Sequence, residues 1–278
     1  MVQKVVAVSG GVDSMVLLSK LCDQYDPSSL VVAHFDHGIR DDSREDAAFV
    51  RMTVKQYGCL YEMRREELGA QASEELARDR RYAFLFDMVK KYDAPLVTAH
   101  HLDDLVETIA LNIQRGTGWR GLTPFSRAIE RPLLSMEKRE IIAYAQKHKI
   151  TWREDSTNTD TRYARNQIRL SATRLPVDTK RQLLSLYVTQ RMLRDAIEEE
   201  TRVYVGKGNE RNRYDFIMLP QKVQLEAIRQ VTRGRLTRPQ CARLALRIAT
   251  ARPRTRYQAG SFVEVQFTTR TFTVELLK

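Results

Sequence analysis

The sequence feature that most constrains the fold is the run "VVAVSGGVDSMVLL" at residues 5–18. Its first four residues are apolar, which is typical of a short strand buried on both faces of a parallel sheet. A second apolar run begins at Met15 and opens a helix. Strand, tight loop and helix in this order predict an α/β fold whose first loop lies at the carboxyl edge of the sheet.

The loop "SGGVDS" itself predicts a phosphate-binding turn. Gly10 and Gly11 permit backbone conformations that are closed to other residues, and Ser9, Ser14 and the turn N–H groups point toward one small volume. The loop is not a Walker A sequence, because no Lys-Ser or Lys-Thr follows the glycines, and it is not a G-x-G-x-x-G turn. A Gly-Gly turn between strand and helix is also ordinary turn chemistry, so the loop alone leaves that alternative open.

The rest of the chain divides into two regions with different sequence patterns. Strand-like runs at 4–9, 29–35, 59–65 and 95–100 alternate with helical stretches at 15–22, 47–58, 75–92 and 102–114. This alternation predicts a Rossmann-like parallel sheet with helices on both faces. From about Pro176 the pattern predicts helices at 181–200, 220–231 and 238–251, and then a β-hairpin across 262–277. We therefore predict an α/β catalytic domain at 1–178 and a smaller, mainly helical domain at 179–278.

The net charge is concentrated in the second of these regions. The chain carries +11, from 46 Lys and Arg against 35 Asp and Glu. Residues 1–179 contain 26 basic and 26 acidic residues, whereas residues 180–278 contain 20 and 9. A basic surface can simply aid solubility, but segregation on this scale favours a polyanionic partner such as RNA.

Two function classes are disfavoured by composition. No run approaches the roughly 20 apolar residues that a membrane helix needs, and the N-terminus enters the first strand without a signal-peptide pattern, so we expect a cytoplasmic protein without a membrane partner. The three cysteines, Cys22, Cys59 and Cys241, lie far apart in the sequence and never in C-x-x-C spacing. We therefore expect small buried side chains and neither a disulfide framework nor a cysteine metal site.

Four of the five histidines follow two predicted strands. His34 and His37 lie in "VVAHFDHGIR", and His100 and His101 lie in "LVTAHHLDD". Ligands in open parallel sheets bind at the carboxyl ends of the strands, so this clustering favours a functional site over packing needs. The group around Asp36 could hold a transition metal, but beside a nucleotide loop Asp36 and Asp13 are better suited to Mg²⁺.

The helix after "TAHH" presents an acidic face. Val106, Ile109, Ala110 and Ile113 are spaced to face the core, whereas Asp103, Asp104 and Glu107 lie on a neighbouring face. Carboxylates in a first turn commonly serve the helix dipole, which is the structural alternative. Next to a nucleotide site, the pair Asp104 and Glu107, one turn apart, would attract an amine.

These motifs together resemble one family. "SGGVDS" is similar to the signature of PP-loop ATP pyrophosphatases. With "HFDHGIR", "ASEELARDRRYAFL", "TAHHLDDLVETIALNIQRGTGWRGL", "RPLL" and "EDSTNTDTRYARNQIR", the order and spacing resemble bacterial tRNA(Ile)-lysidine synthetases. The resemblance spans residues 9–169.

The resemblance implies a reaction on tRNA(Ile) with a CAU anticodon. ATP, with Mg²⁺, activates C2 of the wobble cytidine as an adenylate, and the amine of free L-lysine then displaces AMP to form lysidine. Pyrophosphate and AMP are the other products. Attack at the α phosphate needs positioning and charge neutralisation but no covalent enzyme nucleophile.

The resemblance also implies roles for individual residues. The nucleotide would be bound by Ser9, Gly10, Gly11, Val12, Asp13, Ser14, His34 and Arg115, with Asp13 and Asp36 at the metal. Lysine would be held by His100, Asp104 and Glu107, while Arg78 and Arg81 would face ATP phosphates or the lysine carboxylate. The sequence leaves open whether Asp36, Asp104 or His100 accepts the proton of the lysine amine.

Candidate tRNA contacts lie in two regions. Arg165, Asn166 and Arg169 in "RYARNQIR" would meet phosphates of ATP or of the tRNA, and Arg229, Arg233 and Arg235 cluster where a predicted helix ends. The turn formed by Arg115 and Gly116 could equally be a plain helix C-cap. The oligomeric state stays open, and a homodimer is one candidate.

The sequence leaves two alternative functions open. A PP-loop enzyme that transfers sulfur to tRNA shares the adenylation step, but it generally needs paired catalytic cysteines or a cluster-binding C-x-x-C. The second rival is a nucleotide- and tRNA-binding protein without turnover. Many relatives also continue into a further C-terminal module that this chain is too short to contain, so we expect either a short member or a truncated chain.

Overall fold

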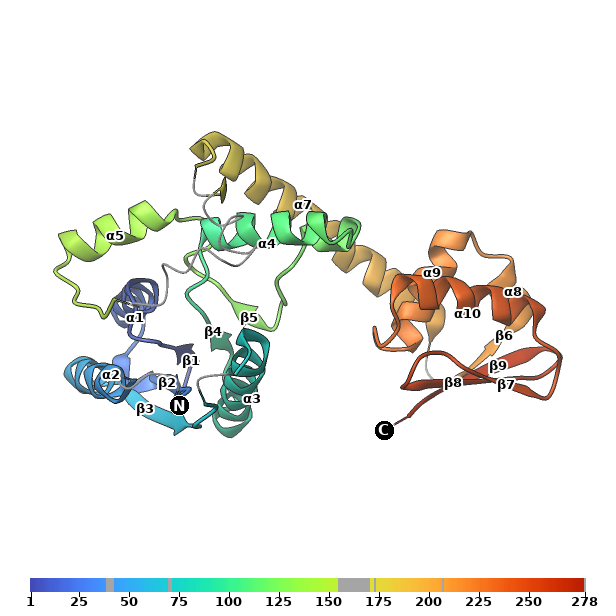
Figure 1. Cartoon of the computed structure of the whole chain (residues 1–278), viewed down its shortest axis with the longest axis horizontal. Coiled ribbons are helices and arrows are strands. Elements are labelled where there is room, and N and C mark those ends of the chain that lie inside the picture. The colour runs from blue at the N-terminus through green and yellow to red at the C-terminus, as the bar shows by residue number, and fades with distance from the viewer. Residues whose placement is uncertain (39–42, 70–71, 155–170, 173, 207, 278) are drawn as a thin grey trace. The chain divides into compact units, whose positions relative to one another are not determined.

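The computed structural model describes residues 1–38, 43–69, 72–154, 171–172, 174–206 and 208–277. The chain forms two compact units, Met1–Val188 and Thr189–Lys278. Figure 1 labels the elements of each unit. Among the described residues, no helix is both long enough and apolar enough to span a bilayer.

The first unit is built on a five-stranded parallel sheet, which confirms the predicted fold class. The order is β3-β2-β1-β4-β5. The strands are β1 (Lys4–Ala7), β2 (Leu30–Asp36), β3 (Leu60–Arg65), β4 (Leu96–Val97) and β5 (Ile129–Glu130). Val6 of the central strand pairs with Val32 on one side and Val97 on the other.

Alternation of side chains along the central strand sends apolar groups to both faces. Val6 packs with apolar residues of α1 (Val12–Gln24), α2 (Ser43–Tyr57) and α5 (Lys138–Lys147). Val5, which points the other way, packs with Phe84, Leu85 and Met88 of α3 (Glu74–Tyr92). Figure 1 shows α1 and α2 on one side of this sheet and α3 on the other. Because both faces are covered, the strands can be continuously apolar.

Helix α4 (Leu102–Gln114) follows the carboxyl end of β4 and has the predicted bounds. Leu102, Leu105 and Ile109 pack against Tyr187 in the first part of α7 (Val177–Val205). The expectation that Ile113 faces the core is wrong, because its side chain is 62% exposed. Ile113 lies in the last turn of α4, beyond the part of the helix that the neighbouring elements cover.

Several short elements of the first unit were not predicted. Helix α5 begins with a capping box in which Glu137 and Glu140 satisfy backbone N–H groups, and that pattern could have revealed it. The other missed elements are β5 and the 3-10 turns η1 (Pro27–Ser29) and η2 (Trp119–Leu122).

The second unit packs helices on an antiparallel sheet of order β6-β9-β8-β7. The predicted hairpin is confirmed as β8 (Val263–Phe267) and β9 (Thr271–Leu276), and the predicted helices as α9 (Gln221–Val231) and α10 (Arg238–Thr250). The unpredicted elements are β6 (Glu210–Asn212), α8 (Arg213–Ile217) and β7 (Thr255–Gln258). Both missed strands are short and polar, so they carry little apolar alternation.

Candidate active site

The loop between β1 and α1 is organised around one hydroxyl group. Ser14 Oγ accepts hydrogen bonds from the N–H groups of Ser9 and Gly10, both at 3.2 Å, and donates to Gly11 O at 2.9 Å. Gly10 has φ = 95°, and an added Cβ would lie 3.2 Å from Val50 Cγ2, so this position requires glycine. Val12 starts α1 with its side chain in the core. The loop therefore leaves only backbone and small polar groups at the helix N-terminus, where an anion binds best.

Asp13, in the first turn of α1, is held by a lysine from another element. Both of its carboxylate oxygens accept hydrogen bonds from Lys138 Nζ, at 2.6 and 2.7 Å. The two side chains are 31% and 32% exposed, so solvent and ligands can reach the pair. Lys138 opens α5 and was not among the residues predicted from the sequence.

The β4–α4 loop adjoins the same carboxylate. His101 Nε2 lies 3.9 Å from Asp13 Oδ1 and 3.5 Å from Asp104 Oδ2, and the backbone N–H of His101 donates to Asp104 Oδ2 at 2.9 Å. Asp104 therefore closes a capping box at the start of α4. This local structural role differs from the helix-dipole role that the sequence left as the alternative. The structure thus brings Asp13, next to the glycine loop, and the predicted lysine ligand Asp104 to the same ring nitrogen of one histidine.

Glu107 and Asp103 lie on more buried parts of α4. Glu107 is 5% exposed, and Asp103 accepts hydrogen bonds from Lys180 Nζ at 2.6 Å and from the N–H of Lys138 at 2.8 Å. Lys180 is also 3.1 Å from Glu137 Oε1. Burial opposes ionisation of Asp103, but these hydrogen bonds outweigh it and lower its pKa. A buried lysine therefore joins the N-terminal ends of α4, α5 and α7.

His100 faces a cationic environment. Its Nδ1 is 2.8 Å from Thr98 Oγ1, and its ring lies 5.2 Å from that of Phe125. Burial, followed by the positive charges of Arg131, Arg78 and Arg81, lowers the pKa of His100 to about 3. The two α3 arginines predicted from the sequence thus lie within electrostatic reach of the histidine, and both also contact the Tyr82 ring.

The polar side chains of His34 and Asp36, at the C-terminal end of β2, make hydrogen bonds to other groups of the protein. His34 Nδ1 donates to Val8 O at 2.8 Å, and burial lowers the pKa of this histidine, which favours the neutral ring. Burial would raise the pKa of Asp36, but hydrogen bonds from Gly38 N–H, Ser43 and Arg65 lower it. Arg65 Nη1 lies 2.6 Å from Asp36 Oδ2, and the Asp36 side chain is only 2% exposed. Arg65 is a further residue that sequence reasoning missed.

The remaining predicted site residues belong to other elements of the chain or fall outside the described residues. Arg115 is the exposed C-cap residue of α4, followed by Gly116 at φ = 66°. Arg165, Asn166 and Arg169 fall outside the described residues. Arg229, Arg233 and Arg235 belong to the second unit, where Arg233 is exposed at φ = 51° and Arg235 Nη1 donates to Leu277 O at 2.6 Å.

The described residues contain no group of three or more His, Cys, Asp or Glu side chains arranged to hold a metal ion. A Mg²⁺ ion bound through phosphates does not require such a group, because one or two carboxylates usually suffice. Asp13 fits this need, since its side chain is 31% exposed and already holds a cationic group. Asp36 fits it less well, because its side chain is only 2% exposed.

The parallel sheet and its glycine-bearing first loop define a nucleotide-binding α/β protein, and the comparison with known families agrees. The family model of the PP-loop domain matches residues 2–175, so the chain belongs to this family. Among solved structures it is similar in fold to the U34-tRNA thiolase NcsA from Methanococcus maripaludis. The TM-score is 0.55 and the identity 15%, and the alignment covers 69% of this chain and 72% of that one.

Curated relatives named tRNA(Ile)-lysidine synthase are more similar in sequence. The protein from Thermosipho africanus is 41% identical over 179 residues, covering 59% of this chain and 41% of the relative. The one from Hydrogenovibrio crunogenus is 35% identical over 182 residues, covering 60% and 43%. The match thus spans about two fifths of the length of each relative.

Proposed function

We propose that this chain ligates free L-lysine to C2 of the wobble cytidine of tRNA(Ile), consuming ATP and releasing AMP and pyrophosphate. The observation that carries the proposal is the approach of the β1–α1 loop to the start of α4. Asp13, which follows the glycine loop, and Asp104, in the first turn of α4, lie 3.9 and 3.5 Å from the same atom, His101 Nε2. One reaction centre could therefore hold both ATP and lysine. The names of the relatives support the same reaction.

In this proposal the β1–α1 loop binds the phosphates of ATP. Its N–H groups at the start of α1 would stabilise negative charge, and Lys138 would add a cation beside Asp13. Mg²⁺ would be held by Asp13 and the phosphates, with Asp36 as the second predicted ligand. When bound, the ion would neutralise charge that develops on the pyrophosphate leaving group.

Lysine would bind at the N-terminal part of α4. The carboxylates of Asp104 and Glu107 would attract its amine, and Arg78 or Arg81 would pair with its carboxylate or with phosphate. Attack on C2 requires loss of a proton from the amine. With a pKa of about 3, His100 has no advantage as a proton acceptor over a carboxylate. Of the two carboxylates that the sequence leaves open, Asp36 has a 2% exposed side chain and Asp104 a 32% exposed one, so Asp104 is our choice.

One structural feature bears on the sulfur-transfer alternative, because two cysteines lie close together in the structure. Cys22 Sγ and Cys59 Sγ are 3.6 Å apart, although 37 residues separate them in the sequence. Cys22 lies near the C-terminal end of α1, and Cys59 directly precedes β3. Both positions belong to the edge of the sheet opposite the β1–α1 loop. This pair therefore cannot deliver sulfur to a base at the candidate site.

The reaction is tested by following the products of ATP. We expect AMP and pyrophosphate to form from ATP, and sustained release to require both lysine and cytidine-bearing tRNA(Ile). Formation of ADP and phosphate would contradict the assignment. Binding of ATP and tRNA without joint dependence of turnover on lysine would favour the non-catalytic alternative.

A further inference from the structure

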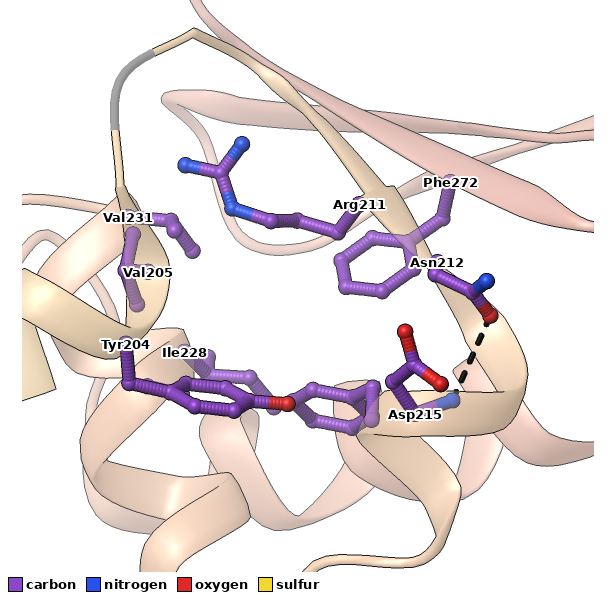
Figure 2. A pocket seen from close by; sticks show the side chains of 10 residues that line it. Tyr204, Val205, Arg211, Asn212, Asp215, Ile228, Val231 and Phe272 are labelled. Atoms are coloured by element: carbon purple, nitrogen blue, oxygen red, sulfur yellow. Dashed lines mark hydrogen bonds between the residues drawn. The ribbon is translucent and has the colours of Figure 1, made fainter.

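The second unit contains a cavity of about 260 Å³ that the proposed reaction does not use. It is enclosed by the C-terminal end of α7, by β6 and α8, by α9 and by Phe272 of β9. Figure 2 shows its apolar wall, which includes Val205, Ile228 and Val231, and the polar side chains of Arg211 and Asp215 around it. A cavity below the roughly 300–1,000 Å³ of drug-sized sites suits one flat ring system.

Arg211 contributes an unsatisfied donor to this cavity. Its Nη1 and Nη2 donate to Glu210 O at 2.7 Å and Gly208 O at 2.8 Å, which fixes the guanidinium. Its Nε is buried and has no hydrogen-bond partner among the described residues. Burial also lowers the pKa of Arg211. Because native proteins rarely leave a buried donor unpaired, this atom points to a ligand that carries an acceptor.

Asp215 contributes an anionic acceptor at another part of the wall. Its backbone N–H donates to Asn212 Oδ1 at 3.3 Å, which holds the first turn of α8. Burial raises the pKa of Tyr204, and the negative charge of Asp215 raises it further. In Figure 2 the Asp215 side chain rises toward the space between the Tyr204 ring and Arg211. The site thus combines aromatic surface, a fixed donor and an anionic acceptor.

We propose that this cavity binds one unpaired guanine base of the RNA partner. Guanine offers adjacent N1–H and N2–H₂ donors, which a carboxylate can accept together, and its O6 and N7 acceptors line the neighbouring edge of the ring system. Asp215 would read the donor edge and Arg211 Nε an acceptor, with the base against Tyr204. Adenine, cytosine and uracil lack two adjacent donors of this kind. Aromatic stacking is the common means by which proteins hold unstacked bases.

The choice of RNA rests on the proposed function and on charge. From Thr189 to the end the sequence contains 18 basic and 9 acidic residues, so the surroundings attract a polyanion. A carboxylate within so basic a unit weakens general attraction for phosphate. Its presence in the cavity is therefore better explained by recognition of a base than by backbone binding.

Guanosine is the direct probe, because it carries no phosphate. It is titrated into the full-length chain while the NMR signals of Arg211 Nε–H and the Tyr204 ring are followed. We expect saturable shifts, with an affinity at least about tenfold higher than for adenosine. Asp215→Asn should lower the guanosine affinity by roughly tenfold or more, since it removes a charge-assisted hydrogen-bond acceptor. Glu275→Gln, an exposed change elsewhere in the unit, should leave it unchanged.

Binding of tRNA gives an independent readout. Asp215→Asn makes the chain more basic, so electrostatics alone would strengthen tRNA binding. We expect weaker tRNA binding, because a contact to a base is lost. The dependence of tRNA binding on salt should stay the same, because no contact to a phosphate is lost. Tighter binding of tRNA by Asp215→Asn, absence of guanosine shifts, or equal affinity for adenosine would each overturn the proposal.

The outcomes also separate this proposal from the proposed function. Lysine transfer to tRNA(Ile) by the wild type without any guanosine binding would refute the base pocket and leave the reaction intact. Guanosine binding by a protein that transfers no lysine would support the pocket and refute the reaction.

Discussion

Lys138 Nζ lies 2.6 and 2.7 Å from the two carboxylate oxygens of Asp13, so α5 places a cation on the carboxylate that follows the glycine loop. The two residues are 125 positions apart, and the contact links α1 with α5. Since phosphate would bind at the same helix N-terminus, an uncompensated Asp13 would repel it. Lys138 therefore keeps this end of the loop suited to an anion.

The first prediction concerns this lysine. Lys138→Met should weaken ATP binding by roughly tenfold, because Asp13 then faces the phosphates without a neutralising partner. Equilibrium binding of labelled ATP measures the effect. Lys147→Met, an exposed change at the end of the same helix, serves as the control. Unchanged ATP affinity in Lys138→Met would show that Lys138 has no part in the nucleotide site.

The second prediction concerns stability and the buried charge cluster. Lys180→Met should lower the free energy of unfolding by about 3–5 kcal/mol, because Asp103 and Glu137 lose the buried cation that both contact, and Glu137 keeps only the exposed Arg139. Arg139→Ala removes a salt bridge to the same Glu137, but the Arg139 side chain is 70% exposed, so it should cost at most about 1 kcal/mol. Denaturant unfolding compares the two. Equal losses would refute the special role of burial.

The third prediction is a dependence of stability on pH. The pKa of His100 is about 3 in the folded chain and about 6.5 when unfolded, so the unfolded state binds the proton first as pH falls. The stability that neutral His100 contributes is complete above pH 6.5 and is lost progressively toward pH 3. His100→Gln should therefore reduce the decline of the unfolding free energy between pH 6.5 and 5, whereas His148→Gln, at an exposed position, serves as the control. The same steep decline in His100→Gln would contradict the lowered pKa.

The fourth prediction separates lysine binding from helix capping. Asp104→Asn and Glu107→Gln should each raise KM for lysine about tenfold to a hundredfold while ATP binding stays nearly constant, because each removes a charge that attracts the amine. Glu140→Gln is a matched control, since Glu140 closes the capping box of α5 as Asp104 closes that of α4. A loss of stability without a change in KM would leave Asp104 with its capping role alone.

The fifth prediction addresses tRNA binding by the basic unit. Of the three clustered arginines, Arg233 is the best target, because it is exposed while Arg235 already donates to Leu277 O. Arg233→Gln should lower tRNA affinity and reduce the slope of log affinity against log salt by about one. Glu264→Gln in the same unit should not reduce that slope. An unchanged slope in Arg233→Gln would indicate that this arginine contacts no phosphate.

Much of the fold could be predicted because it follows from local patterns. The apolar runs that form β1 and β2 and the periodicity of α4 are local, and the helix bounds of α4 were matched. Elements of two or three residues, such as β5 and β6, carry no such period. Their strand pairing is fixed by neighbours that are distant in the sequence.

The candidate site likewise contains some residues that the local sequence predicts and others that it does not. Ser9, Gly10, Gly11 and Ser14 form one local loop, so the motif alone predicted their grouping. Lys138, Arg65 and Lys180 were missed because each meets its carboxylate across 29 to 125 positions of chain. Nothing in the local sequence around a lysine or arginine tells which distant carboxylate it will neutralise.

The most direct test of the central claim is transfer of labelled lysine to RNA. The full chain is incubated with ATP, Mg²⁺, labelled L-lysine and tRNA(Ile) carrying either cytidine or uridine at the wobble position. We predict stable label in the cytidine-bearing tRNA alone, with one AMP formed per lysine attached. Equal labelling of both tRNAs, or AMP formation without any label in RNA, would contradict the proposed ligation of lysine to the wobble cytidine.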